Sequence, residues 1–130
     1  MTATEPGVIT KLSPRPFADT VSRLIGLVET KGLKLFGVID QRAEANDAGL
    51  DLRDTTLVLF GSPAAGTPVM AASPLAALDL PLKVLIWADD GHVNVSYLAP
   101  AALGNRHDLS PELESRLEGI GPLTDALVAP

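Results

Sequence analysis

The amino-acid sequence predicts an α+β fold: a two-layer sandwich in which a largely antiparallel sheet of about five strands has helices packed on one face. Three observations predict it. Five short runs are rich in β-branched and aliphatic residues. An amphipathic helical pattern separates the first two runs, and an Asp-Gly turn typical of a β-hairpin joins the last two. At 130 residues, the chain is expected to form one domain, residues 1–130, around one hydrophobic core.

The first third of the chain is predicted to form a strand, a helix and a second strand. Residues 8–12 favour a strand, and the prolines that follow favour a helix that starts near Phe17. Apolar residues then recur at helical spacing up to Val28, and Gly32 is suited to end the helix. Residues 33–39 are apolar on both faces, which predicts a strand inside the sheet rather than at its edge.

The middle of the chain is predicted to contain a third strand followed by a loop. Residues 41–46 can form a short helix, and residues 55–60 favour a buried strand. The Gly- and Pro-rich stretch 61–68 is predicted to be a structured loop. Two short helical segments are expected after it, over residues 69–72 and, started by a Ser-Pro pair, over residues 75–78.

Two glycines are expected to shape the predicted loop. Gly61 and Gly66 follow a buried strand, and a tight reversal there would require a positive φ, which glycine adopts at low cost. On this interpretation, Gly66→Val lowers the free energy of unfolding by about 1–3 kcal/mol through backbone strain.

The last third of the chain is predicted to be a hairpin followed by helices. Residues 82–98 form the hairpin, with Trp87 at least partly buried against the sheet. A brief helix is expected over residues 100–103, followed by a loop that contains Arg106 and His107. A Ser-Pro pair at Ser110 starts the last helix, whose end is weakened by glycines and a proline.

Composition excludes several classes of function. Ten Lys and Arg residues face sixteen Asp and Glu residues, a net charge of -6, so a nucleic-acid partner is not expected. The absence of cysteine excludes disulfides, thiol nucleophiles and iron–sulfur clusters. No secretory signal and no run of transmembrane length is present, so the protein is expected to be cytoplasmic with no membrane partner.

Two catalytic motifs fail at their defining positions. Gly61 and Gly66 have the spacing of a phosphate-binding P-loop, but Thr67 and Pro68 replace the lysine and the hydroxyl residue that this motif requires. Ser62 lacks the two flanking glycines of a nucleophile elbow. The His and Asp residues show no metal-ligand spacing, so no metal site is predicted, and no cofactor is assigned.

Histidines are the only side chains with an ordinary pKa near neutrality, and the chain has two. His92 is expected to be a solvated residue at the hairpin tip. His107 either caps a helix end or acts in a site, with Asp40 or Asp79 as the carboxylate that orients it. Ordinary strand-end or capping roles are the favoured explanation of both carboxylates.

Three motifs suggest a family. They are Phe17, Leu24 and Gly32 in the first helix; Phe60-Gly61-Ser62-Pro63 followed by Gly66-Thr67-Pro68 and Met70; and Leu78-Asp79-Leu80-Pro81-Leu82 before the hairpin. With them, residues 8–120 resemble the family called domain of unknown function 302. Arg106-His107 also resembles a pair in that family, whereas Gln41 stands where the family has a histidine. The resemblance implies an α+β fold and a homodimer, and it implies no reaction or cofactor.

The favoured hypothesis is a small-molecule-binding or sensing domain, because sites tend to lie on rigid loops held by a scaffold. Leu75 and Leu78 are expected to add an apolar wall to its site. The candidate ligand-binding residues are Gly61, Ser62, Gly66, Thr67, Met70 and Arg106. The alternatives are a small enzyme that uses His107 as general acid or base, and a homodimeric assembly protein without catalysis.

Overall fold

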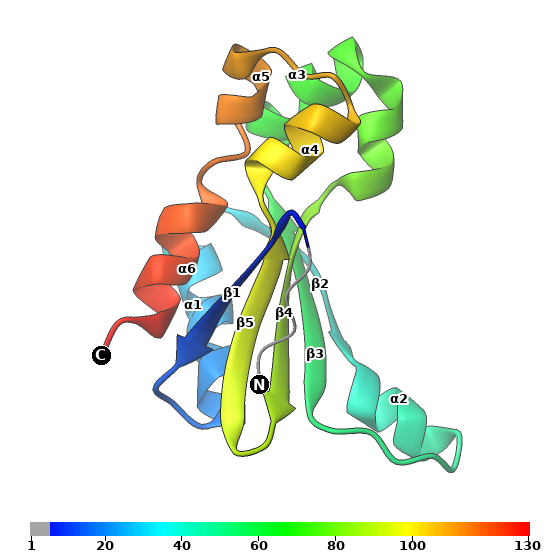
Figure 1. Cartoon of the computed structure of the whole chain (residues 1–130), viewed down its shortest axis with the longest axis vertical. Helices are drawn as coiled ribbons and strands as arrows, with labels where there is room; N and C mark the ends of the chain where they lie inside the picture. Colours follow the sequence, from blue (N-terminus) through cyan, green and yellow to red (C-terminus); the bar gives the residue numbers. More distant parts are fainter. Residues whose placement is uncertain (1–5) are drawn as a thin grey trace.

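The computed structural model describes residues 6–130 and confirms the predicted α+β fold (Figure 1). One sheet has the strand order β1-β5-β4-β3-β2, and every neighbouring pair is antiparallel. The strands are β1 (Val8–Ser13), β2 (Lys34–Asp40), β3 (Thr55–Gly61), β4 (Leu82–Asp89) and β5 (His92–Leu98).

Two helices, α1 (Phe17–Thr30) and α6 (Ile120–Val128), pack together against one face of the sheet (Figure 1). Alternate residues of a strand point to the same face, so Val58 and Phe60 of β3 both face these helices. The main core between the two layers consists of Leu24, Val28, Val58, Phe60, Val84, Ile86, Val95, Tyr97, Ile120, Leu123 and Leu127.

A second, smaller core lies at one end of the sheet, shown at the top of Figure 1. Its buried residues are Val69, Ala76, Leu103 and Leu117. The segments at this end are α3 (Pro63–Ala72), η1 (Pro74–Asp79), α4 (Pro100–Arg106) and α5 (Pro111–Ser115), while α2 (Gln41–Asp47) lies near the opposite end. Within residues 6–130, no helix combines the length and the apolar character that a membrane crossing demands.

The predicted interior position of the second strand is wrong. β2 is an edge strand that pairs only with β3, and Phe36 and Val38 are 48% and 42% exposed. A run of apolar residues indicates that a strand has apolar surroundings, but other parts of the protein can supply these surroundings in place of a second neighbouring strand. The ladder shifts register between Leu35 and Gly37, and Phe36 instead forms part of the wall of a cavity.

The predicted loop over residues 61–68 is also wrong, because α3 begins inside it. The Ser62 side chain accepts a hydrogen bond from the Ala65 backbone N–H, and Pro63 occupies the first helical turn, where a missing N–H costs little. Gly61 and Gly66 do not have positive φ, so the strain argument for Gly66→Val fails. A Cβ at Gly66 would meet its nearest atom, Leu80 Cδ1, at 3.8 Å, an ordinary contact.

The hairpin prediction is confirmed. Asp90 and Gly91 have φ of 50° and 80°, which matches the two-residue turn predicted at its tip. Trp87 is partly buried, and its Nε1–H donates to Ser96 Oγ at 2.9 Å.

The C-terminal third differs from prediction in two places. The helix expected over residues 100–103 continues to Arg106, and His107 is its C-cap, so the predicted loop around this pair is wrong. The last predicted helix is two helices, α5 and α6. Pro122 falls in the first turn of α6, where proline is tolerated because the N–H groups there have no partner within the helix.

Candidate functional site

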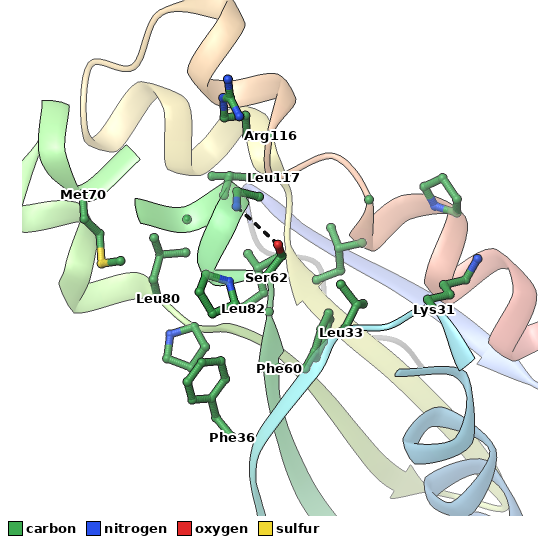
Figure 2. Close-up of a pocket in the computed structure, with 18 residues that line it drawn as sticks. Lys31, Leu33, Phe36, Phe60, Ser62, Met70, Leu80, Leu82, Arg116 and Leu117 are labelled. Atoms are coloured by element: carbon green, nitrogen blue, oxygen red, sulfur yellow. Dashed lines mark hydrogen bonds between the residues drawn. The ribbon is translucent and has the colours of Figure 1, made fainter. Parts of the chain in front are cut away.

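A half-open cavity of about 420 Å³ lies where β3 leads into α3 and the segment after η1 enters β4 (Figure 2). It occupies the junction of the two cores: Phe60 and Ile120 come from the main core, and Leu117 comes from the smaller one. The apolar lining consists of Leu33, Phe36, Phe60, Pro63, Ala65, Met70, Leu80, Pro81, Leu82, Leu117, Ile120 and Pro122.

The cavity follows from the local structure at the end of β3. Ser62 follows the last residue of β3 and caps α3, and α3 leads toward the smaller core instead of covering the sheet. Gly66 and Met70 are four residues apart in α3, and residues at this spacing share one helix face. Both line the cavity, and the glycine leaves space that a side chain would fill.

Three polar side chains line this cavity: Ser62, Lys31 and Arg116. Figure 2 shows Ser62 between the labelled apolar side chains, with Lys31 and Arg116 on separate sides. Arg116 Nη2 is 3.9 Å from Glu112 Oε1, and Lys31 forms no ion pair with any residue in the range 6–130. No Asp or Glu in the described range 6–130 lines the cavity.

Four of the six predicted ligand-binding residues line the cavity, namely Gly61, Ser62, Gly66 and Met70. Thr67 and Arg106 do not line it; both are exposed, and Arg106 lies near Asp79 instead. The predicted apolar wall is wrong in part, because Leu75 and Leu78 are 69% and 78% exposed.

Sequence reasoning missed the cavity residues that come from other elements. Lys31, Phe36 and Arg116 belong to segments far apart in the chain, and no local motif connects them. The one available signal was the Ser62-Pro63 pair, which is typical of a helix start and would have placed Gly66 and Met70 on one face.

The candidate catalytic residues form a separate cluster. His107 Nε2 and Asp79 Oδ2 are 2.6 Å apart, and Arg106 Nε lies 3.5 Å from the same carboxylate oxygen. Ser73 Oγ donates to the His107 backbone carbonyl at 3.3 Å. Asp40 is elsewhere, at the N-cap of α2, so the predicted alternative pairing of Asp40 with His107 is wrong.

The His107–Asp79 pair lies in a packed region. Their side chains are only 7% and 17% exposed, and the small gap beside them has no volume that a water molecule could occupy. Asp79 can orient the imidazole, but the described residues leave no room for a substrate next to it. The pair connects the end of η1 to the end of α4.

Two further predictions concern histidine and metal sites. His92 is exposed at the first position of β5, beside the hairpin turn, as predicted. In the part of the chain that the structure describes, no three His, Asp or Glu side chains group in a way that could hold a metal ion.

Comparison with known families gives one match over most of the chain. A family model described as "Domain of unknown function DUF302" matches residues 9–123. A crystal structure of an uncharacterised conserved DUF302 protein from Bacillus stearothermophilus has a TM-score of 0.80 at 17% identity, covering 95% of this chain and 97% of that one. This likeness supports the same fold.

Curated relatives are found in Brucella. The protein named fluoride-specific ion channel FluC 1 of Brucella suis biovar 1 is 33% identical over 123 residues, which are 91% of this chain and 48% of that protein. The protein of the same name from Brucella abortus biovar 1 is also 33% identical, over 46% of its length. This chain therefore spans about half the length of the curated relatives it matches.

Proposed function

Since the chain belongs to the DUF302 family of domains of unknown function, we propose that it is a small-molecule-binding or sensing domain whose ligand occupies the cavity between β3, α3 and β4. The observation that carries the proposal is the cavity of about 420 Å³ with its apolar lining. Small-molecule sites typically measure about 300–1,000 Å³ and are mostly apolar with a few polar groups.

The cavity leaves apolar side chains in contact with water, which is unfavourable for the domain alone and supports a role in binding. It is half open, and a ligand that covers its apolar lining removes this surface from water. Gly66 adds to this effect, because glycine inside a helix is about 1 kcal/mol less favourable than alanine. A larger residue at this position would fill the cavity without a clash at its Cβ. The presence of glycine there is therefore consistent with space that a ligand occupies.

Gly66→Leu tests the proposal directly. We expect the neutral fluorophore N-phenyl-1-naphthylamine to bind one site per chain, and the variant to weaken this binding about tenfold or more because leucine fills the cavity. The free energy of unfolding in urea should stay the same or rise, since leucine is a better helix former than glycine.

A matched control separates filling of the cavity from a general effect of the substitution. Gly26→Leu makes the same change in α1, at an exposed position with no atom near its Cβ, and should leave fluorophore binding unchanged. Equal binding by the parent protein and Gly66→Leu would contradict the proposal.

The binding proposal extends to the stretch shared with the Brucella proteins. About half of each of those proteins matches this chain, and the name fluoride-specific ion channel refers to the whole protein. We propose that the shared stretch is a ligand-binding half in them as well. Ion conduction is not part of the function proposed for this chain, whose candidate site is an apolar cavity.

A homodimer is the second proposal, and a sheet face without a helix packed on it in residues 6–130 favours it. Helices α1 and α6 cover one face of the sheet (Figure 1). On the opposite face, no helix of residues 6–130 packs against β1, β5 and β4. Leu12 and Leu98 on that face are 55% and 41% exposed, and Trp87 shares the face with them. In a dimer with a two-fold axis, each copy would cover this face of the other.

Leu12→Glu combined with Leu98→Glu is expected to convert the dimer to a monomer, because carboxylates placed in an apolar contact are costly to bury. Sedimentation equilibrium measures the mass. Leu75→Glu with Leu78→Glu is the control, since it removes exposed leucines from η1, away from the sheet. A parent protein with the mass of one chain at all micromolar concentrations would contradict the dimer.

A further inference from the structure

We infer that the ligand of this cavity is a free amphipathic organic anion, with an apolar body inside the cavity and one anionic headgroup at its mouth. The inference rests on the proposed binding function and names the chemical class of the ligand. Three observations support it: the charges around the cavity are positive, these charges have no strong partners, and Ser62 lies between the apolar walls.

The charge around the cavity is opposite in sign to that of the whole protein. The chain has a net charge of -6, yet no Asp or Glu within residues 6–130 lines the cavity. Both charged lining residues, Lys31 and Arg116, are cations. A concave site lined by a single sign of charge concentrates ligands of the opposite sign, so this site favours an anion over a cation.

Both cations are available to a ligand. Lys31 is exposed and has no ion-pair partner among residues 6–130. Arg116 has one acidic neighbour, Glu112, at 3.9 Å, and the Glu112 side chain is 83% exposed. A solvent-exposed pair at this distance contributes little, so a ligand carboxylate, sulfonate or phosphate can displace it. The planar guanidinium is well suited to bind such groups through two hydrogen bonds.

Ser62 supplies a polar group nearer the apolar walls (Figure 2). Its hydroxyl oxygen accepts from the Ala65 N–H at 3.3 Å, and the hydroxyl proton donates to no acceptor within residues 6–130, so it can donate to a ligand. The cavity also meets the first turn of α3, which contains no acidic residue, so the partial positive charge of the helix start is not neutralised locally.

The walls fit an apolar body attached to such a headgroup. Met70 and Leu80 lie on one side, as Figure 2 shows, and methionine adapts its shape to flexible ligands. Phe36 is 48% exposed at the rim, and an apolar ligand would cover its ring. Removal of this surface from water drives binding of the body, while the cations select the headgroup.

The test compares three straight-chain amphiphiles of similar chain length and different headgroup charge: anionic decanoate, neutral decanol and cationic decyltrimethylammonium, each below its micelle concentration or solubility limit. Displacement of N-phenyl-1-naphthylamine measures their affinities. We expect decanoate to bind tightest, and Lys31→Gln with Arg116→Gln to weaken decanoate about tenfold while decanol binding stays unchanged. Lys31→Glu with Arg116→Glu should reverse the preference, so that decyltrimethylammonium binds more tightly than decanoate.

Controls separate the headgroup effect from net charge and from the cavity itself. Arg42→Gln with Arg53→Gln removes the same net charge from residues that do not line the cavity and should leave decanoate binding unchanged. If decanol and decanoate bind equally well, and the Lys31 and Arg116 variants do not change their affinities, the anion inference is overturned and the binding function stays intact. Failure of the fluorophore and all three amphiphiles to bind would overturn both. Binding to phosphatidylglycerol vesicles without binding of decanoate would favour a membrane surface and overturn the free ligand.

Discussion

Phe60→Ala is expected to lower the free energy of unfolding by about 3–5 kcal/mol, the usual range for removing a buried phenylalanine side chain. Phe60 is only 1% exposed and belongs to the main core beneath α1 and α6. It also lines the cavity, so its removal would extend the existing space into the core.

Urea unfolding at equilibrium measures the loss for Phe60→Ala. Leu57→Ala is the control on the same strand, because Leu57 is only partly buried and points to the opposite face of the sheet. It should lose less stability than Phe60→Ala. A loss of about 1 kcal/mol or less for Phe60→Ala would contradict the placement of this side chain in the core.

Asp79→Ala is expected to lower the free energy of unfolding by about 1–3 kcal/mol, because it leaves the His107 ring buried without its hydrogen-bond partner. The carboxylate also lies 3.5 Å from Arg106, so its removal takes a second contact from the end of α4. We propose on these grounds that the pair holds η1 and α4 together.

A double-mutant cycle with Asp79→Ala and His107→Ala isolates the contribution of the pair. The two losses should add to more than the loss in the double variant, because the second change removes a partner that is already lost. Asp79→Asn keeps an oxygen that can accept a hydrogen bond and should retain more stability than Asp79→Ala. Full stability of Asp79→Ala would contradict the structural role.

Several errors of prediction have a common cause. Gly61, Gly66 and Pro68 are turn-favouring residues, and their density predicted a loop, although Pro68 lies within α3. Val69, which is fully buried in the smaller core, belongs to the same helix, and such tertiary packing can outweigh local preferences. The Ser-Pro pair at Ser110 predicted a helix start correctly, and the same pair at Ser62 has the same role.

The site shows the same division between local and tertiary information. Asp79 and His107 are each identifiable as candidates from residue type, but their separation of 2.6 Å depends on how η1 and α4 pack. Ser62 and Met70 were identified together because they are close in the chain. Lys31 and Arg116 were not, because they are far apart in the sequence and lie on separate sides of the cavity.

The sequence by itself determined the α+β class, the first helix, the five strand segments and the hairpin turn, because periodicity and turn chemistry act over a few neighbouring residues. Tertiary structure alone decided that β2 lies at the sheet edge, that His107 is packed against Asp79 outside the cavity, and that a cavity lies at the junction of the two cores. These features depend on which distant segments pack together and on how completely their side chains fill the space between them. Local residue patterns do not specify either property.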